Sequence, residues 1–311
     1  LPFDWLLADA AAEGFARRAP NFSARQTLSA SQRKGIARAF AVFGIAGLLL
    51  PGLPLLATAM LAPLVFGATI LFRLFLITVA RLPHPKPALR MRGITPLLPV
   101  YTVLVAMKDE AATIPQLARS LRGLDYPEAL LDLKLLIEEG DEATRRAIAA
   151  ERWPSRTELI IVPPGSPQTK PRALNYGLLQ ARGAYVVVYD AEDRPHPGQL
   201  RAAVDAFTRA GPQTVCLQAP LVGVPAKGGW LARQWALEYA IQFGLIVPAL
   251  SRLGLPIALG GTSNHFRRRA LMGAGGWDAW NVTEDADLGH RLARLGWRVG
   301  TIASPTLEAP P

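Results

Sequence analysis

Cysteine is nearly absent from this sequence, because Cys216 is the single cysteine among 311 residues. A lone cysteine excludes a framework of disulfides within the chain and fits a reducing compartment. A Gly-x-Gly-x-x-Gly pattern after the first expected strand is also missing, which argues against a dinucleotide-dependent oxidoreductase. No basic stripe with interleaved aromatic side chains occurs in the expected folded part. The net charge of +10 therefore does not predict a nucleic-acid partner.

Acidic side chains are absent from residues 36–98, which carry six basic ones, and residues 39–72 carry no charge at all. This uncharged run of 34 residues exceeds the roughly 20 that one helical membrane crossing needs. Pro51, Gly52 and Pro54 interrupt it with turn-forming residues, so we expect a transmembrane helical hairpin over residues 36–80. A buried hairpin in a soluble core and a single kinked span are the alternatives.

Composition divides the chain into four parts. Residues 1–35 carry no chemical motif and are expected to be an N-terminal segment, the tail of an upstream domain. After the hairpin, residues 81–98 form a linker rich in proline and basic side chains, and residues 99–311 form the main domain. The chain begins at Leu1 and ends at Pro311, so we expect it to be a fragment of a longer protein.

The main domain alternates apolar strands with helices, which predicts an α/β fold with a mostly parallel, Rossmann-like sheet. The first four strands are expected at residues 101–107, 133–137, 159–162 and 185–189. Ligands collect at the carboxyl ends of such strands, and grouped carboxylates there suit Mg²⁺ or Mn²⁺. Three of the four strands end in acids, which are Asp109, Glu110, Glu138, Glu139, Asp190, Glu192 and Asp193.

Further motifs follow in the same domain. They are Lys-Pro-Arg-Ala-Leu-Asn at 170–175, Asp-Ala-Glu-Asp at 190–193, Gly-Gly-Thr-Ser-Asn at 260–264, Gly-Gly-Trp-Asp at 275–278 and Thr-Glu-Asp at 283–285. With the strand-end acids, their order and spacing resemble the processive family 2 glycosyltransferases, the group that contains bacterial cellulose synthase. The resemblance implies a GT-A fold behind membrane helices.

The same resemblance implies a membrane-bound, metal-dependent, inverting transfer of a hexose from a UDP-sugar to a growing polysaccharide. Mg²⁺ or Mn²⁺ is the implied cofactor. The implied partners are the UDP-sugar, a glycan acceptor, the lipid bilayer and accessory or export subunits, with no nucleic acid. Basic side chains flank the apolar run on both sides, so the positive-inside rule favours a cytoplasmic catalytic domain. Localisation in a bacterial-type inner membrane, as a multi-pass protein, follows from these expectations.

Site residues are transferred by motif. Asp285 is implied as the catalytic base and Glu284 as the residue that orients the site. Glu192 or Asp193 would hold the metal, and glutamate in place of the family's usual aspartate leaves open which one. The nucleotide-sugar is assigned to Glu110, Glu138, Glu139, Lys170 and Asp190. A small-residue loop for the acceptor is assigned to Gly261, Thr262, Ser263 and Asn264.

Two features keep alternatives open. The family continues with a Gln-x-x-Arg-Trp motif and further membrane helices, whereas this chain ends before them, so weak or no activity is expected of it in isolation. Residues 229–253 show helical spacing of aromatic and apolar side chains, which predicts either a packed core helix or an amphipathic helix against a membrane. Transfer to a lipid carrier and an inactive membrane scaffold are the rival functions.

Overall fold

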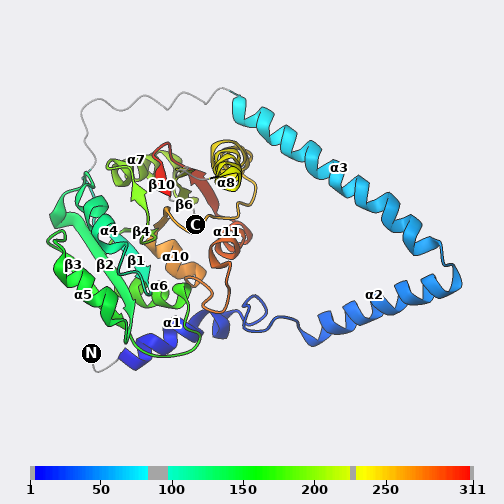
Figure 1. Cartoon of the computed structure of the whole chain (residues 1–311), viewed down its shortest axis with the longest axis horizontal. Coiled ribbons are helices and arrows are strands. Elements are labelled where there is room, and N and C mark those ends of the chain that lie inside the picture. Colours follow the sequence, from blue (N-terminus) through cyan, green and yellow to red (C-terminus); the bar gives the residue numbers. More distant parts are fainter. Residues whose placement is uncertain (1–3, 83–96, 225–228, 309–311) are drawn as a thin grey trace.

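A twisted, mostly parallel sheet forms the centre of the main domain. The computed structural model describes residues 4–82, 97–224 and 229–308. Its main sheet has seven strands in the order β3-β2-β1-β4-β8-β6-β9, and β8 runs antiparallel to both of its neighbours. This confirms the predicted α/β fold (Figure 1). The strands are β1 Tyr101–Met107, β2 Leu131–Glu138, β3 Thr157–Val162, β4 Tyr185–Tyr189, β6 Thr214–Gln218, β8 Asn264–Arg267 and β9 Arg298–Thr301.

Alternation along the strands explains why helices cover both faces of this sheet. In β1, Leu104 faces one core cluster while Val103 and Val105 face the other. Helices α4 Ile114–Arg122, α5 Glu142–Ala150 and α7 Gln199–Ala210 pack on the second face. The first face carries α6 Lys170–Leu178, α10 Arg268–Ala274 and α11 Glu284–Arg294.

Strand register brings the acid-bearing loops together. Strand β1 is paired in parallel with β2 and β4, and Tyr101 lies opposite both Leu131 and Tyr185. The carboxyl ends of the three strands therefore reach the same edge of the sheet. Strands β1 and β4 are mostly apolar, buried runs, whereas β2 also buries Asp132 and Lys134 and ends at Glu138.

A second sheet of three short strands covers this edge. Its order is β5-β10-β7, with β5 at Arg194–Pro195, β10 at Thr306–Glu308 and β7 at Leu221–Gly223. Strand β5 directly follows the acidic loop after β4, so β10 reaches that loop from a distant part of the chain. A 3₁₀ turn, Glu128–Leu130, precedes β2. The helical spacing of residues 229–253 is realised as α8 Trp230–Ile241, a π-helical turn Gln242–Ile246 and α9 Val247–Leu253.

The N-terminal segment is part of the same packed body. Helix α1, Asp4–Arg18, lies against α6 and buries Ala11, Ala12 and Phe15 (Figure 1). The sequence predicted only the tail of another domain here, because the weak helical period gave no sign of the surface that α1 covers.

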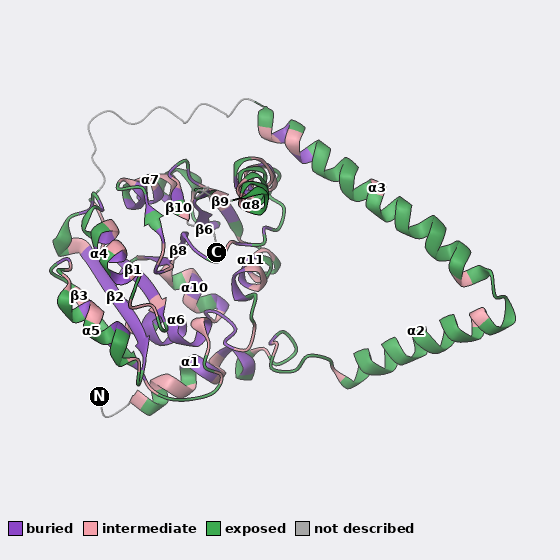
Figure 2. Ribbon diagram, in the orientation of Figure 1, coloured by how far each residue is buried: buried purple, intermediate pink, exposed green. Residues whose placement is uncertain are grey.

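Two long helices extend away from the main domain (Figure 1). Helix α2, Ala30–Leu49, begins with a capping box at Ser29, and α3 spans Leu53–Arg81. Figure 2 shows both as largely exposed, and one described helix, α3, is long and apolar enough to cross a membrane. The two helices meet at the expected turn but diverge from it, so the paired hairpin is not observed (Figure 1). Most of the expected linker, residues 83–96, lies outside the described residues.

Candidate functional site

Lys170 joins two acid-bearing parts of the site. It is the first residue of α6, and its Nζ lies 2.5 Å from Asp190 Oδ1 and 2.8 Å from the carbonyl oxygen of Gly261. Burial acts to lower the pKa of Lys170, but the carboxylates of Asp190, Asp285 and Glu284 outweigh it and raise that pKa. The ammonium is therefore a permanent positive charge at the edge where the strand-end acids collect.

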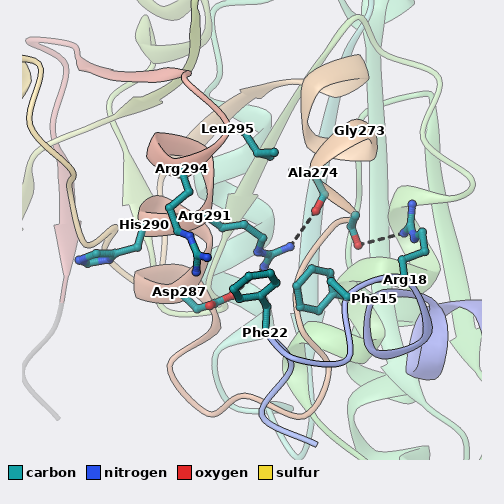
Figure 3. Close-up of a pocket in the computed structure, with 12 residues that line it drawn as sticks. Phe15, Arg18, Phe22, Gly273, Ala274, Asp287, His290, Arg291, Arg294 and Leu295 are labelled. Atoms are coloured by element: carbon teal, nitrogen blue, oxygen red, sulfur yellow. Dashed lines mark hydrogen bonds and ion pairs between the residues drawn. The ribbon is translucent and has the colours of Figure 1, made fainter.

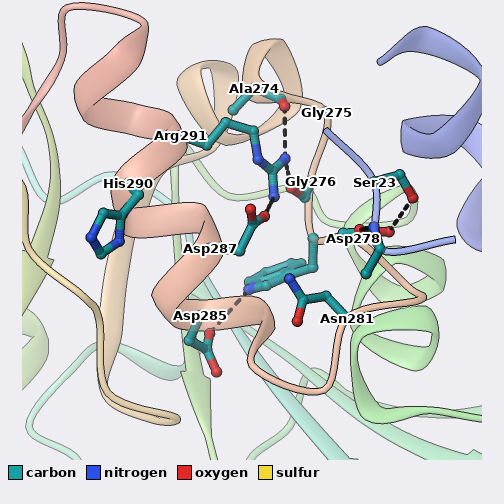
Figure 4. Close-up of polar contacts among 12 residues, drawn as sticks. Ser23, Ala274, Gly275, Gly276, Asp278, Asn281, Asp285, Asp287, His290 and Arg291 are labelled. Atoms are coloured by element: carbon teal, nitrogen blue, oxygen red, sulfur yellow. Dashed lines mark hydrogen bonds and ion pairs between the residues drawn. The ribbon is translucent and has the colours of Figure 1, made fainter. Parts of the chain in front are cut away.

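Asp285 lies in the first turn of α11 and is 6 % exposed. Its Oδ1 accepts a hydrogen bond from the indole Nε1 of Trp277 at 3.2 Å (Figure 4). Burial raises the pKa of Asp285 to about 8, although nearby Lys170 pulls it down, and Glu284 and Asp190 push it further up. A buried carboxylate with a raised pKa can accept a proton near neutral pH, which is what a general base requires.

The start of α11 lacks a side-chain cap. Thr283 occupies the N-cap position, but its side chain makes no cap hydrogen bond and instead donates to Asn281 Oδ1. Glu284 is also 6 % exposed, and burial raises the pKa of its carboxyl. Two acids are thus buried at the end of a helix whose N-terminal dipole favours negative charge.

The three acids in the loop after β4, Asp190, Glu192 and Asp193, differ in burial and in hydrogen bonding. Asp193 is fully buried, and its Oδ2 accepts hydrogen bonds from the backbone N–H of Asp190 at 2.8 Å and from the hydroxyl of Thr262. Glu192 is partly exposed, and Gln116 on α4 donates to its carbonyl oxygen at 2.9 Å. Burial and the charge of Asp190 raise the pKa of Glu192. Asp193 therefore braces the turn, while Glu192 is free to face a ligand.

Glu308 is a site residue that the sequence analysis missed. It ends β10, and Tyr239 on α8 donates to its Oε1 at 3.5 Å. Burial raises the pKa of Glu308 to about 7, with Asp190 and Glu192 adding to the effect. The only available signal was another acid near the end of the sequence. The strand that it ends, Thr306–Glu308, is three residues long with a single apolar side chain, too short to be recognised from the sequence.

The donor set at this edge fits a hard divalent cation. Among the described residues, no group of three His, Cys, Asp or Glu side chains is already arranged as a metal cluster. The buried Oε2 of Glu308 and Oδ1 of Asp193 nevertheless have no hydrogen-bond partner in the part of the chain that the structure describes. The charge of Asp190 adds to the raised pKa values of Glu192 and Glu308, and Glu192 also raises that of Glu308, effects that a bound cation would offset. Carboxylate oxygens are the ligands that Mg²⁺ and Mn²⁺ prefer.

The four residues assigned to an acceptor lie in two environments. Gly261 is exposed, and a Cβ atom there would lie 3.9 Å from Asp285 Oδ2. Thr262, Ser263 and Asn264 are buried, and each bonds inside the protein. Their hydrogen-bond partners are Asp193, Thr306 and the carbonyl oxygen of Gly260. This loop therefore presents backbone to the base, while its side chains support the site from within.

The acids expected near the nucleoside lie further along the same edge. Glu138 is 6 % exposed and lies 3.4 Å from the guanidinium of Arg172, whereas its neighbour Glu139 is exposed. Glu110 is half-buried and accepts from the hydroxyl of Thr113 at 3.2 Å. The paired Glu138 is already satisfied by protein, so Glu139 is the freer of the two carboxylates.

His265 has a structural place. It is fully buried between Tyr101, at 2.7 Å, and Gln199, at 3.2 Å, and burial lowers its pKa to about 3. Its ring stays neutral at physiological pH and supports the sheet.

Comparison with known proteins agrees with this geometry. Residues 98–307 match the model of the family described as "Glycosyltransferase like family 2". The beta-monoglucosyldiacylglycerol synthase of Trichormus variabilis is 28 % identical over 214 residues, which cover 68 % of this chain and 45 % of that protein. Glucomannan 4-beta-mannosyltransferase 2 of Arabidopsis thaliana is 26 % identical, covering 64 % of this chain and 39 % of the relative. The chain thus spans less than half the length of either relative.

A solved structure supports the fold independently. A mannosyltransferase from Pyrobaculum calidifontis, solved in complex with GDP-Man and Mn²⁺, matches with a TM-score of 0.61 at 25 % identity. The match covers 79 % of this chain and 66 % of that one. This likeness supports a GT-A-like α/β fold for this chain, with its mostly parallel sheet.

Proposed function

We propose a reaction from the premise that this chain belongs to the glycosyltransferase-like family 2. The reaction is inverting transfer of a hexose from a UDP-sugar to a growing glycan at a membrane. The observation that carries the proposal is the opposition of Asp285, a buried base, to the pair of Lys170 and Asp190 across Gly261. Such a site has a proton acceptor on one side and a place for a charged leaving group on the other.

Each residue then has a role. Asp285 takes the proton of the acceptor hydroxyl while that oxygen forms a bond to the anomeric carbon. The bond from this carbon to the diphosphate breaks on the opposite face, which inverts the configuration. Lys170 lies where its charge stabilises the departing diphosphate. The negative charge of Glu284 raises the pKa of the base, Asp285.

A divalent cation would be held by carboxylates at the same edge of the sheet. Glu192 and Glu308 are the carboxylates we assign to it, with Asp190 beside them and Asp193 holding the turn. When bound, the metal supplies charge neutralisation for the leaving group. The presence of Mn²⁺ with GDP-Man in the Pyrobaculum mannosyltransferase complex supports this choice.

The donor screen is the test of this function. The full protein in nanodiscs would be offered UDP-glucose, UDP-galactose, UDP-N-acetylglucosamine and GDP-mannose with Mn²⁺ or Mg²⁺, and nucleotide release would be measured. Turnover with a UDP-sugar and a longer glycan product supports the proposal. Turnover restricted to GDP-mannose contradicts the donor, and failure with every donor supports the rival scaffold.

Transfer to a lipid is a second candidate, because one helix beside the site has an exposed apolar face. Tyr239 of α8 contacts Glu308, while Trp230, Leu231 and Leu237 of the same helix are more than half exposed. Such a face suits a membrane surface from which a lipid acceptor could reach the base. The diacylglycerol in the name of the Trichormus relative supports this route. A product that partitions into organic solvent with one added hexose would favour it over the glycan.

A further inference from the structure

Residues 4–28, which belong to the N-terminal segment, contact the loop at residues 275–278 that leads to the base. Ser23 Oγ donates to Asp278 Oδ1 at 3.0 Å, and the backbone N–H of Ala24 donates to Oδ2 at 2.6 Å (Figure 4). Asp278 is fully buried and Ser23 is 4 % exposed. A buried carboxylate is costly without its donors, so this contact fixes the loop against the segment.

A second contact joins the same two parts through α6. Asn175 Nδ2 donates to the carbonyl oxygen of Ala11, at 3.1 Å, and to that of Trp277, at 2.8 Å. Its Oδ1 accepts from the backbone N–H of Trp277 at 2.9 Å. One amide side chain therefore holds α1 and the backbone of Trp277 in a fixed relation.

A third contact reaches α11 itself. The guanidinium of Arg291 lies 3.9 Å from the ring centroid of Phe15 (Figure 3) and donates to the carbonyl oxygens of Ala274 and Gly276 (Figure 4). A cleft of about 460 Å³ remains between the segment and α11. Because packing there is not continuous, these directional contacts hold the segment to the helix that carries the base.

The three contacts hold Trp277 or the residues next to it in the chain, Gly276 and Asp278. The side chain of Trp277 is fully buried against Phe266, with ring centroids 5.8 Å apart, and its Nε1 donates to Asp285. A shift of the loop would move this donor relative to the carboxylate. We propose that residues 4–28 are a positioning element for the catalytic base, acting on Asp285 through Asp278 and Trp277. The inference rests on the proposed function, because it presumes that Asp285 is the base.

Ser23 gives the sharpest test, since one hydroxyl can be removed or kept. In the full protein, Ser23→Ala should lower kcat about tenfold while the donor KM changes less than about twofold, because Lys170 and Asp190 are untouched. Ser23→Thr keeps the hydroxyl and should retain most of the turnover. Thr27→Ala removes an exposed hydroxyl from the same segment and serves as the matched control. The stoichiometry of donor binding, measured by calorimetry, reports the fraction of folded protein.

Further variants distinguish positioning from simple stability. If Ser23 acts through Asp278, the double variant Ser23→Ala/Asp278→Asn should lose no more turnover than Asp278→Asn alone. An unchanged kcat in Ser23→Ala overturns the inference, as does a loss of kcat matched by an equal loss of donor-binding sites. In those outcomes the unsubstituted protein still turns over. If it shows no turnover with any donor, the proposed function fails, and the inference fails with it.

Discussion

At the scale of single residues, the site depends on how one buried carboxylate is balanced. Burial disfavours the charge of Asp285 and Glu284 adds repulsion, whereas Lys170 and the indole of Trp277 favour the charged form. Burial wins, and the pKa of Asp285 is raised to about 8. A base that charges only in this range is strong enough to take a hydroxyl proton yet ionised in part at neutral pH.

Trp277→Phe tests this balance. The ring remains, but the donor to Asp285 is lost, so the carboxylate becomes harder to ionise and its pKa rises. Turnover requires the charged base and increases as pH rises through about 8. The variant should move this limb of the pH–rate profile upward by about one unit, in keeping with the size of a hydrogen bond to a charged group. An unmoved limb would mean that another group limits the reaction.

At the scale of elements, the strands that could be predicted are those whose pattern lies within one uninterrupted stretch of the sequence. The buried runs that became β1 and β4 had the predicted bounds, because apolar side chains and the acids that follow mark where such strands end. Glu308 could not be found in this way, because β10 is defined by its pairing with β5 and β7, which are distant in the sequence. The difference between Glu192 and Asp193 is set by one turn, in which Thr262 and the Asp190 amide hold Asp193.

Glu308→Gln tests the role assigned to β10. The amide keeps the size of the side chain but removes one negative charge from the edge shared with Asp190 and Glu192. We expect the Mn²⁺ concentration for half-maximal activity to rise about tenfold, with little change in protein stability. Glu128→Gln changes an exposed acid elsewhere and should leave this value unchanged. If both variants needed the same Mn²⁺ concentration for half-maximal activity, Glu308 would not be a metal ligand.

At the scale of the whole molecule, the catalytic domain and the long helices are linked at two points. Residues 4–28 lead from the base-holding contacts into α2, and Arg252 of α9 donates to the carbonyl oxygens of Val79 and Leu82 at the end of α3. Leu76 and Val79 are the buried residues of α3, Ile77 and Ala80 beside them are partly buried, and most of its remaining apolar side chains are exposed. An exposed apolar surface of this size is expected to be buried against a partner, and we propose that this partner is the lipid bilayer.

A paired substitution in α3 tests membrane insertion. Leu61→Arg with Leu64→Arg places two charges among exposed apolar side chains, each costing about 2.5–3.5 kcal/mol at the centre of a span. The unsubstituted protein should stay in the membrane pellet after an alkaline wash, and the variant should be released in large part. Ser31→Arg, before the apolar run, should behave like the unsubstituted protein. A soluble unsubstituted protein would rule out α3 as an anchor.

The central claim is that Asp285 removes the proton of the acceptor. Asp285→Asn preserves the shape of the side chain but cannot accept that proton, while Lys170 and Asp190 keep their contact. The most direct measurement is nucleotide release by the full protein carrying this substitution, beside donor binding by calorimetry. We predict that turnover falls by about a thousandfold or more, the upper part of the range for lost general base catalysis, while donor affinity stays within about threefold. Turnover within about tenfold of the unsubstituted protein would contradict the account.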